Sequence, residues 1–186
     1  MALLIFFGLF IIFYSSLYLG KYFSVQNSYI QKIGASIYTK KIKQYETSKG
    51  FKLLRDAVEE RSLSKGMGFI APMIILKSVA FYFISILLIA PLILVLQGIA
   101  MGSLFNYYKT EVGDLKVLSK ITFWQLLSHI IAATYGIIVG IEWIYNKSFD
   151  FELVPSNLEL LLYGSLVLIT GLVAANLEVK SLMNID

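Results

Sequence analysis

The chain has 186 residues, of which 58% are apolar and only 15% are charged, and its mean hydropathy is +0.74. Globular proteins have roughly 25% charged residues, so the composition excludes a disordered chain, a nucleic-acid-binding domain and an ordinary cytosolic enzyme. The sequence has no Cys and one His, so we expect no disulfides and no metal site. We predict an all-α polytopic membrane protein with about five transmembrane helices.

The first apolar run, residues 2–19, ends at Gly20-Lys21. A helix that spans the bilayer needs roughly 20 apolar residues at about 1.5 Å each, which this run supplies. It lacks the basic start, the short apolar core and the small-residue cleavage site of a secretory signal. We therefore interpret residues 1–20 as a retained first transmembrane helix.

Residues 21–66 form the one long polar stretch and hold ten of the 16 Lys and Arg residues. Their apolar residues have helical spacing, for example Ile30, Ile33 and Ile37, and Gly50 is a candidate break between two helices. One interpretation is a pair of amphipathic helices that lie on the lipid headgroups with their lysines in water. The other is a docking surface for a cytoplasmic partner, and the sequence leaves both open.

Residues 69–108 are apolar except for Lys77. A single helix of this length would measure about 60 Å, twice the hydrocarbon thickness of about 30 Å. We predict a tight hairpin of two spans that turns near Ala90-Pro91, with Pro72 at the first position of one helix and Pro91 at the start of the other.

A fourth span is expected over residues 121–145 and a fifth over residues 159–178, after a loop and cap signal at residues 154–157. Residues 67–186 therefore form a predicted four-helix transmembrane bundle. If the N-terminus lies outside, the inner segments carry 14 of the 16 Lys and Arg residues. Because positive residues favour the cytoplasmic side, we predict that Lys21–Gly66 is cytoplasmic in a multi-pass cell-membrane protein.

Small residues recur at four-residue spacing in two of the predicted spans. They are Gly98 and Gly102 in the third span, and Ala132, Gly136 and Gly140 in the fourth. Such stripes let membrane helices approach closely. We predict that they pack inside the bundle, with the fourth span buried, and a homodimer face is the alternative.

Polar side chains in spans are costly and are candidates for function. Five of them fall in the predicted spans: Lys77, Gln97, His129, Asn176 and Glu178. Lys77 lies five residues beyond Pro72, about 8 Å from the predicted inner end of its helix. We predict that all five lie in the inner half of the membrane, where they form one polar cluster.

Within that cluster we predict an ion pair between Lys77 and Glu178 across the second and fifth spans, which would lower the cost of both charges. His129 and Gln97 would complete the hydrogen bonding. The alternative has Lys77 extending to the headgroups, with Glu178 already in water at the helix end.

Three groups of motifs, in order along residues 75–178, resemble the stage II sporulation protein M family. The first group comprises residues 76–79, 90–91 and 96–102; the second comprises residues 124–126 and 132–140; the third is Ala174–Glu178. The chain departs from that family in three places. Gln97 replaces an Asn, Gln125 replaces a Glu, and a Pro-His-Gly before that acid is absent.

The resemblance implies a non-enzymatic protein with five spans. In spore-forming bacteria that family acts as a membrane partner of murein hydrolases during engulfment. No residue or motif of this chain by itself indicates that it acts with cell-wall enzymes.

Phosphate-binding, zinc-protease, nucleophile-elbow and dinucleotide motifs are absent from the sequence, so we expect no enzyme and no cofactor. The expected partners are the lipid bilayer and a protein, or a second copy of the chain, with no nucleic acid and no identified small-molecule substrate. The leading hypothesis is a membrane scaffold or assembly subunit. A transporter or permease subunit and an insertase of the YidC type are the alternatives, and a water-filled cavity beside Lys77, Gln97 or His129 would favour them.

Overall fold

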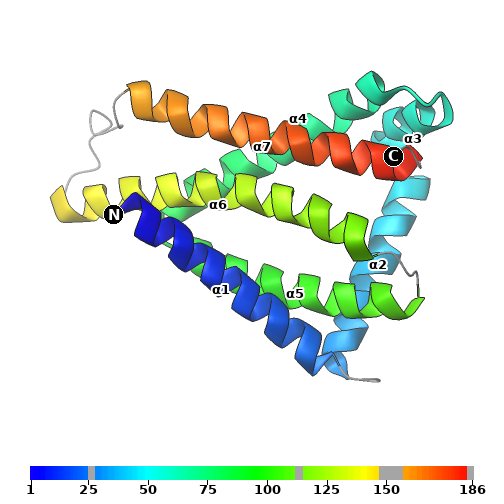
Figure 1. The fold of residues 1–186 in the computed structure, drawn as a ribbon, viewed down its shortest axis with the longest axis horizontal. Helices are drawn as coiled ribbons and strands as arrows, with labels where there is room; N and C mark the ends of the chain where they lie inside the picture. Colours follow the sequence, from blue (N-terminus) through cyan, green and yellow to red (C-terminus); the bar gives the residue numbers. More distant parts are fainter. Residues whose placement is uncertain (25–27, 112–114, 147–156, 184–186) are drawn as a thin grey trace.

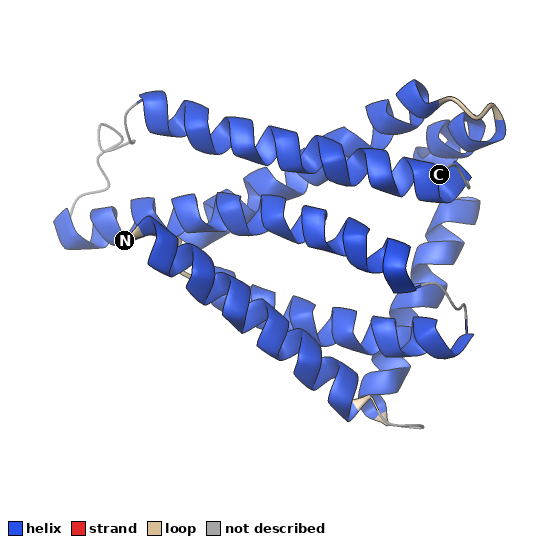
Figure 2. Ribbon diagram, viewed as in Figure 1, coloured by secondary structure: helices blue, strands red, loops and turns tan. Residues whose placement is uncertain are grey.

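The computed structural model describes residues 1–24, 28–111, 115–146 and 157–183, and the elements in these ranges are all helices (Figures 1 and 2). Five are long and apolar enough to cross a membrane, which confirms the predicted class of fold and the five spans. They are α1 (Ala2–Phe23), α4 (Leu63–Ile86), α5 (Ala90–Glu111), α6 (Leu115–Asn146) and α7 (Asn157–Met183). The predicted loop signal at residues 154–156 lies outside the described residues.

The polar segment forms α2 (Tyr29–Thr47), the short 3-10 helix η1 (Lys49–Phe51) and α3 (Lys52–Glu59). The hydroxyl of Ser28 accepts a hydrogen bond from the backbone N–H of Gln31 at 3.1 Å and caps α2. α2 runs across the ends of the spanning helices, from the end of α5 toward α3 and the C-terminal end of α7 (Figure 1). We refer to this end of the molecule as the α2 end.

The turn between α4 and α5 comprises Leu87–Ile89, three residues before the predicted position at Ala90-Pro91. Leu88 has a positive φ of 59°, and its N–H donates to the Ser85 carbonyl at 2.8 Å. This left-handed residue ends α4 in the usual way for a helix C-terminus. Ala90 and Pro91 then open α5, where proline's missing N–H costs no helical bond.

Pro72 does not begin α4, contrary to the prediction, because the helix begins nine residues earlier at Leu63 and Pro72 lies inside it. Proline leaves one backbone carbonyl without its helical partner. Spanning helices tolerate this because neighbouring groups and local adjustments satisfy the freed carbonyl. α4 is therefore longer than predicted and reaches almost to α3.

The spans divide into two groups that share α6. α1 packs along α5, whereas α4 packs against α6 and α7, and α4 and α5 diverge from their common turn (Figure 1). One apolar core joins α1, α5 and α6 through Leu9, Phe13, Leu94 and Ile130, among others. A second core joins α3, α4 and α7. The central position of α6 explains why 67% of its spanning window is buried inside the protein, against 33% or less for the other spans.

Candidate functional site

Glycines bring the spanning helices into backbone contact in both groups. A Cβ added at Gly98 would lie 2.7 Å from the Cβ of Ser16, and one at Gly102 would lie 2.7 Å from the backbone nitrogen of Lys21. Both glycines therefore face α1. The stripe of small residues on α5 is occupied within the protein.

The stripe on α6 lies against α4. A Cβ at Gly136 would lie 2.7 Å from the Cβ of Ser85, and one at Gly140 would lie 3.0 Å from the carbonyl carbon of Ile86. Ala132 is 6% exposed and packs with α7 beside Val167. The structure thus places all three small residues of this stripe inside the bundle.

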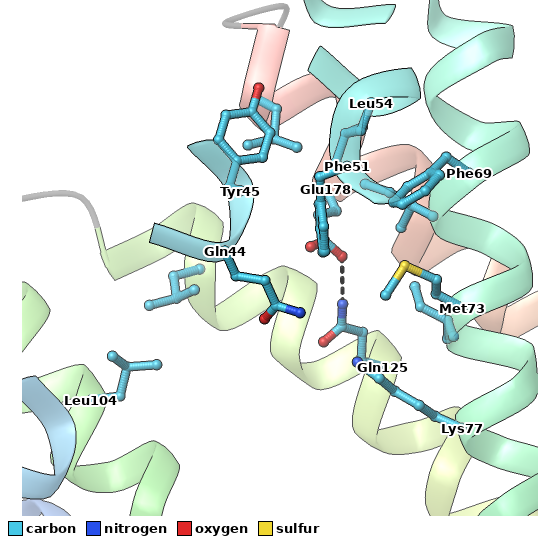
Figure 3. A pocket seen from close by; sticks show the side chains of 14 residues that line it. Gln44, Tyr45, Phe51, Leu54, Phe69, Met73, Lys77, Leu104, Gln125 and Glu178 are labelled. Carbon is cyan, nitrogen blue, oxygen red and sulfur yellow. Dashed lines mark hydrogen bonds between the residues drawn. The ribbon is translucent and has the colours of Figure 1, made fainter. Parts of the chain in front are cut away.

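A cavity of about 600 Å³ lies at the α2 end of the bundle, between the two groups of spans. Its walls are mostly apolar, with four polar side chains (Figure 3). The apolar residues are Tyr45, Phe51, Leu54, Phe69, Ile70, Met73, Ile74, Leu104, Leu118 and Leu182, and the polar residues are Gln44, Lys77, Gln125 and Glu178.

Glu178 in this cavity is held by Gln125, not by Lys77. The Nε2 of Gln125 donates a hydrogen bond to the Oε2 of Glu178 at 2.6 Å, across α6 and α7 (Figure 3). A hydrogen bond to an ionised carboxylate is shorter and stronger than a neutral one. This contact fixes the carboxylate on the wall formed by α6 and α7.

The predicted ion pair between Lys77 and Glu178 is wrong, because no ion pair joins these two described residues. Lys77 nevertheless lines the same cavity, from the opposite wall on α4, and it is exposed. The physical reason is the position of Lys77 along its helix. It lies 14 residues beyond Leu63, about 21 Å, and nine residues before Ile86, about 14 Å.

Lys77 is thus near the middle of α4, deeper than the predicted 8 Å. Side chains on a helix lean toward its N-terminus, which for α4 is the α2 end. The ammonium group is therefore directed back into the cavity, where Figure 3 shows the side chain extending from α4 toward Gln125. Among the described residues it has no hydrogen-bond or ion-pair partner.

The other three members of the predicted cluster do not line the cavity. His129 is one turn beyond Gln125 on α6, is 5% exposed, and stacks on Phe81 with ring centroids 4.9 Å apart. Neither ring nitrogen of His129 has a hydrogen-bond partner among the described residues. The ring of Phe81 on α4 therefore covers the imidazole of His129, which does not line the cavity.

Gln97 and Asn176 also point elsewhere. The Oε1 of Gln97 is buried on α5 with no hydrogen-bond partner among the described residues. Asn176 is half-buried on α7, two residues from Glu178, which turns it about 200° around the helix axis from the carboxylate. Of the five predicted residues, only Lys77 and Glu178 line the cavity, together with Gln125, while His129 lies outside it but close enough to Lys77 to interact with its charge.

A buried pair of serines lies beside the cavity and joins three helices. The hydroxyl groups of Ser78 and Ser128 are 2.8 Å apart, and the hydroxyl of Ser128 also donates to the Val167 carbonyl at 3.2 Å. This contact connects α4, α6 and α7 next to Lys77 and His129. The sequence did not indicate this contact, because a serine hydroxyl on a helix can equally bond to a carbonyl of its own helix.

The polar segment covers the α2 end and contributes to the cavity wall. Gln44 and Tyr45 come from α2, and Leu54 comes from α3. The guanidinium of Arg55 on α3 donates to the carbonyl oxygens of Tyr45 and Ser48, the second at 3.1 Å. This contact fixes the corner between the two helices and so positions the residues that line the cavity.

A second contact holds α2 on α5. Gly34 packs on the backbone of Ser103, whose carbonyl oxygen would lie 2.7 Å from an added Cβ, and the Ser103 hydroxyl donates to the Ile30 carbonyl. Nearby, the side-chain amide of Asn106 donates to the Ser24 carbonyl at 2.6 Å. These contacts attach the first part of α2 to the group of α1 and α5, whereas Tyr45 near its other end packs against the second core. Gln44 and Tyr45 were missed as site residues because their position depends on these long-range contacts.

Within the described ranges, no cluster of three or more His, Cys, Asp or Glu side chains could hold a metal ion. Comparison with known proteins gave no match to a family model, to a curated protein or to a solved structure. What the site does is therefore argued from its own geometry.

Proposed function

We propose that the chain is a non-enzymatic membrane scaffold or assembly subunit that binds a protein partner through the outer surface of α2 and α3. The observation that carries this proposal is a basic surface that packing at Gly34 and hydrogen bonds from Ser103 and Arg55 attach to a glycine-packed bundle. Exposed cations lie on α2 and α3 and on the residues that adjoin them: Lys32, Lys40, Lys43, Lys49, Lys52, Arg61 and Lys65. Lys65 pairs with Glu60, and the other six cations outnumber the remaining exposed acids, Glu46 and Glu59.

The α2 end is cytoplasmic under this proposal. The polar segment holds ten of the 16 Lys and Arg residues, and the end of α7 that carries Lys180 lies at the same end of the molecule (Figure 1). Positive residues in short segments next to spans favour the cytoplasmic side. Residues 147–156, which include Lys147, Asp150 and Glu152, lie outside the described residues.

The proposal places the partner on the basic surface because the glycine stripes are already occupied. Gly98 and Gly102 face α1, and Gly136 and Gly140 face α4. A second copy of the chain would have to displace these contacts to use the same faces. The resemblance to the stage II sporulation protein M family supports the same class of function, a membrane protein that positions other proteins.

Site-specific photo-crosslinking in membranes tests the proposal. A photoreactive residue at Lys40, exposed on α2, should crosslink to one protein, and a charge reversal of Lys32 and Lys43 should abolish the product. The matched control is the same photoreactive residue at Leu162, which is 59% exposed on the spanning part of α7. Equal products at both positions, or a product insensitive to the charge reversal, would contradict a basic docking surface.

A second candidate is an insertase or transporter, and the cavity favours it specifically. A cationic side chain on an otherwise apolar wall, reached from the α2 end, would suit the polar part of a segment that enters the membrane. If this is the function, a Cys introduced at Met73 should react rapidly with a membrane-impermeant thiol reagent. Protection of that Cys in native membranes would favour the scaffold.

A further inference from the structure

The cavity contains a positive charge, on Lys77, that has no ion-pair partner in the part of the chain that the structure describes. Lys77 lies near the middle of a spanning helix, and among the described residues it has no ion pair and no hydrogen bond. The one carboxylate in the cavity, Glu178, is bonded to Gln125 on the other wall. A cation at this depth is stabilised by an anion or by water.

Most of the other residues that line the cavity are apolar, so they suit an apolar part of a ligand. Phe69 and Met73 of α4 face Leu104 of α5 and Leu118 of α6 across the cavity. A volume of about 600 Å³ is within the usual range for ligand sites, roughly 300–1,000 Å³. A ligand that matches both features has a single anionic group beside a long apolar part.

The surrounding membrane supplies such a molecule, and the structure leaves it a way in. The cavity is partly open to its surroundings, and Lys77 in its wall is exposed. α4 and α5 diverge from their turn, and both contribute to the wall (Figures 1 and 3). Exposed lysines at the α2 end, among them Lys43 beside Gln44, would attract anionic lipid to the entrance.

We infer that the cavity binds one phospholipid of the cytoplasmic leaflet, with its phosphate on Lys77 and an acyl chain between Met73 and Leu104. Gln44 lines the same cavity and offers an amide donor to the phosphate. The carboxylate of Glu178 would repel the phosphate. Its hydrogen bond to Gln125 holds it on the wall formed by α6 and α7, opposite Lys77 on α4. The single ammonium group of Lys77 would balance the one negative charge of a phosphodiester.

Native mass spectrometry of the full chain in detergent, with added phosphatidylglycerol, tests the inference. The wild type and Lys77→Arg should each retain one lipid, and Lys77→Met should bind at least about tenfold more weakly, the effect of one lost charge-assisted contact. The matched control is Lys52→Met, which removes an exposed cation that does not line the cavity and should not change binding.

Two further ligands separate the headgroup from the chain. Neutral diacylglycerol and water-soluble glycerol phosphate should each bind much more weakly than phosphatidylglycerol. Equal binding of diacylglycerol would show that apolar filling alone matters, and equal binding of glycerol phosphate would show a soluble ligand. Either result would overturn the lipid site, as would a protein segment crosslinked in the cavity that excludes the lipid.

A second variant decides the matter if Lys77→Met does not fold. Met73→Trp leaves the charge in place and fills the space beside it, so it should reduce phosphatidylglycerol binding while the protein stays folded. Unchanged binding by a folded Met73→Trp protein would place the lipid elsewhere and would refute the inference.

Discussion

Glycines bring α1 close to α5 and also bring α4 close to α6, but the side chains around the two contacts differ. Between α1 and α5, Gly98 and Gly102 bring the backbones together along a face lined by apolar side chains such as Phe13. The other group adds hydrogen bonds between side chains, from Ser128 and from Gln125.

This difference shows how one bundle combines a close apolar seam, the interface between α1 and α5, with a cavity that could hold a ligand. Close backbone contact leaves no space, so the seam between α1 and α5 has no room for a ligand. The cavity lies instead between the two groups at the α2 end, where α4 and α5 have diverged, and the bond between Gln125 and Glu178 fixes part of its wall. Four predictions test this comparison, from the largest expected effect to the smallest.

Replacing Gly136 by Leu should have the largest effect. The new side chain would meet the backbone of Tyr82 and the Cβ of Ser85, neither of which can move without shifting α4. We expect a loss of about 2–3 kcal/mol in the free energy of unfolding, the upper part of the usual range for overpacking. Thermal unfolding in detergent measures it.

Gly164→Leu is the control for that substitution, because nothing lies within 4 Å of a Cβ added at Gly164 on α7. It should change stability by less than about 0.5 kcal/mol. If the two variants were equally stable, the glycine contact between α4 and α6 would not be part of the folded protein.

The second prediction concerns Gln125 and Glu178. A double-mutant cycle with Gln125→Leu and Glu178→Gln should give a coupling energy of about 1–2 kcal/mol, near the top of the range for hydrogen bonds between membrane helices. The parallel cycle with Lys77→Met and Glu178→Gln should be close to additive. A larger coupling for the Lys77 cycle would restore the ion pair that the structure excludes.

The third prediction is that Ser128→Ala destabilises the protein by about 0.6–1 kcal/mol. This substitution removes the contact with Ser78 and the bond to the Val167 carbonyl while creating little empty space. Urea unfolding in mild detergent is a suitable measurement. Thr134→Val is the control, because the hydroxyl of Thr134 bonds only to the Ile130 carbonyl of its own helix in the described structure.

The smallest effect is expected for His129→Phe. The ring of His129 is buried against Phe81, and its two nitrogens have no partner in the described part of the chain. Phenylalanine keeps the stacked ring and removes two buried polar atoms, so stability should stay constant or rise by up to about 1 kcal/mol. A marked loss, measured by the same thermal unfolding, would mean that the imidazole has a polar role.

The sequence alone was sufficient for the spans because hydropathy and length are local properties. The run at residues 2–19 and the length of residues 69–108 predicted α1 and the pair α4 and α5 without any long-range contact. The turn between that pair was predicted within three residues, since proline is favoured at the start of a helix, where Pro91 lies. The predicted start of α4 was wrong, because the same preference was applied to Pro72, which lies inside a spanning helix that tolerates it.

Only the tertiary structure decided which neighbour each side chain meets. Whether Gly136 faces α4 or a second copy, and whether Glu178 meets Gln125 or Lys77, depends on how far each helix is rotated about its axis. Hydropathy is almost unchanged by such rotation, because lipid and protein interior are similarly apolar. The sequence determined which segments cross the membrane, and packing between distant segments determined the cavity.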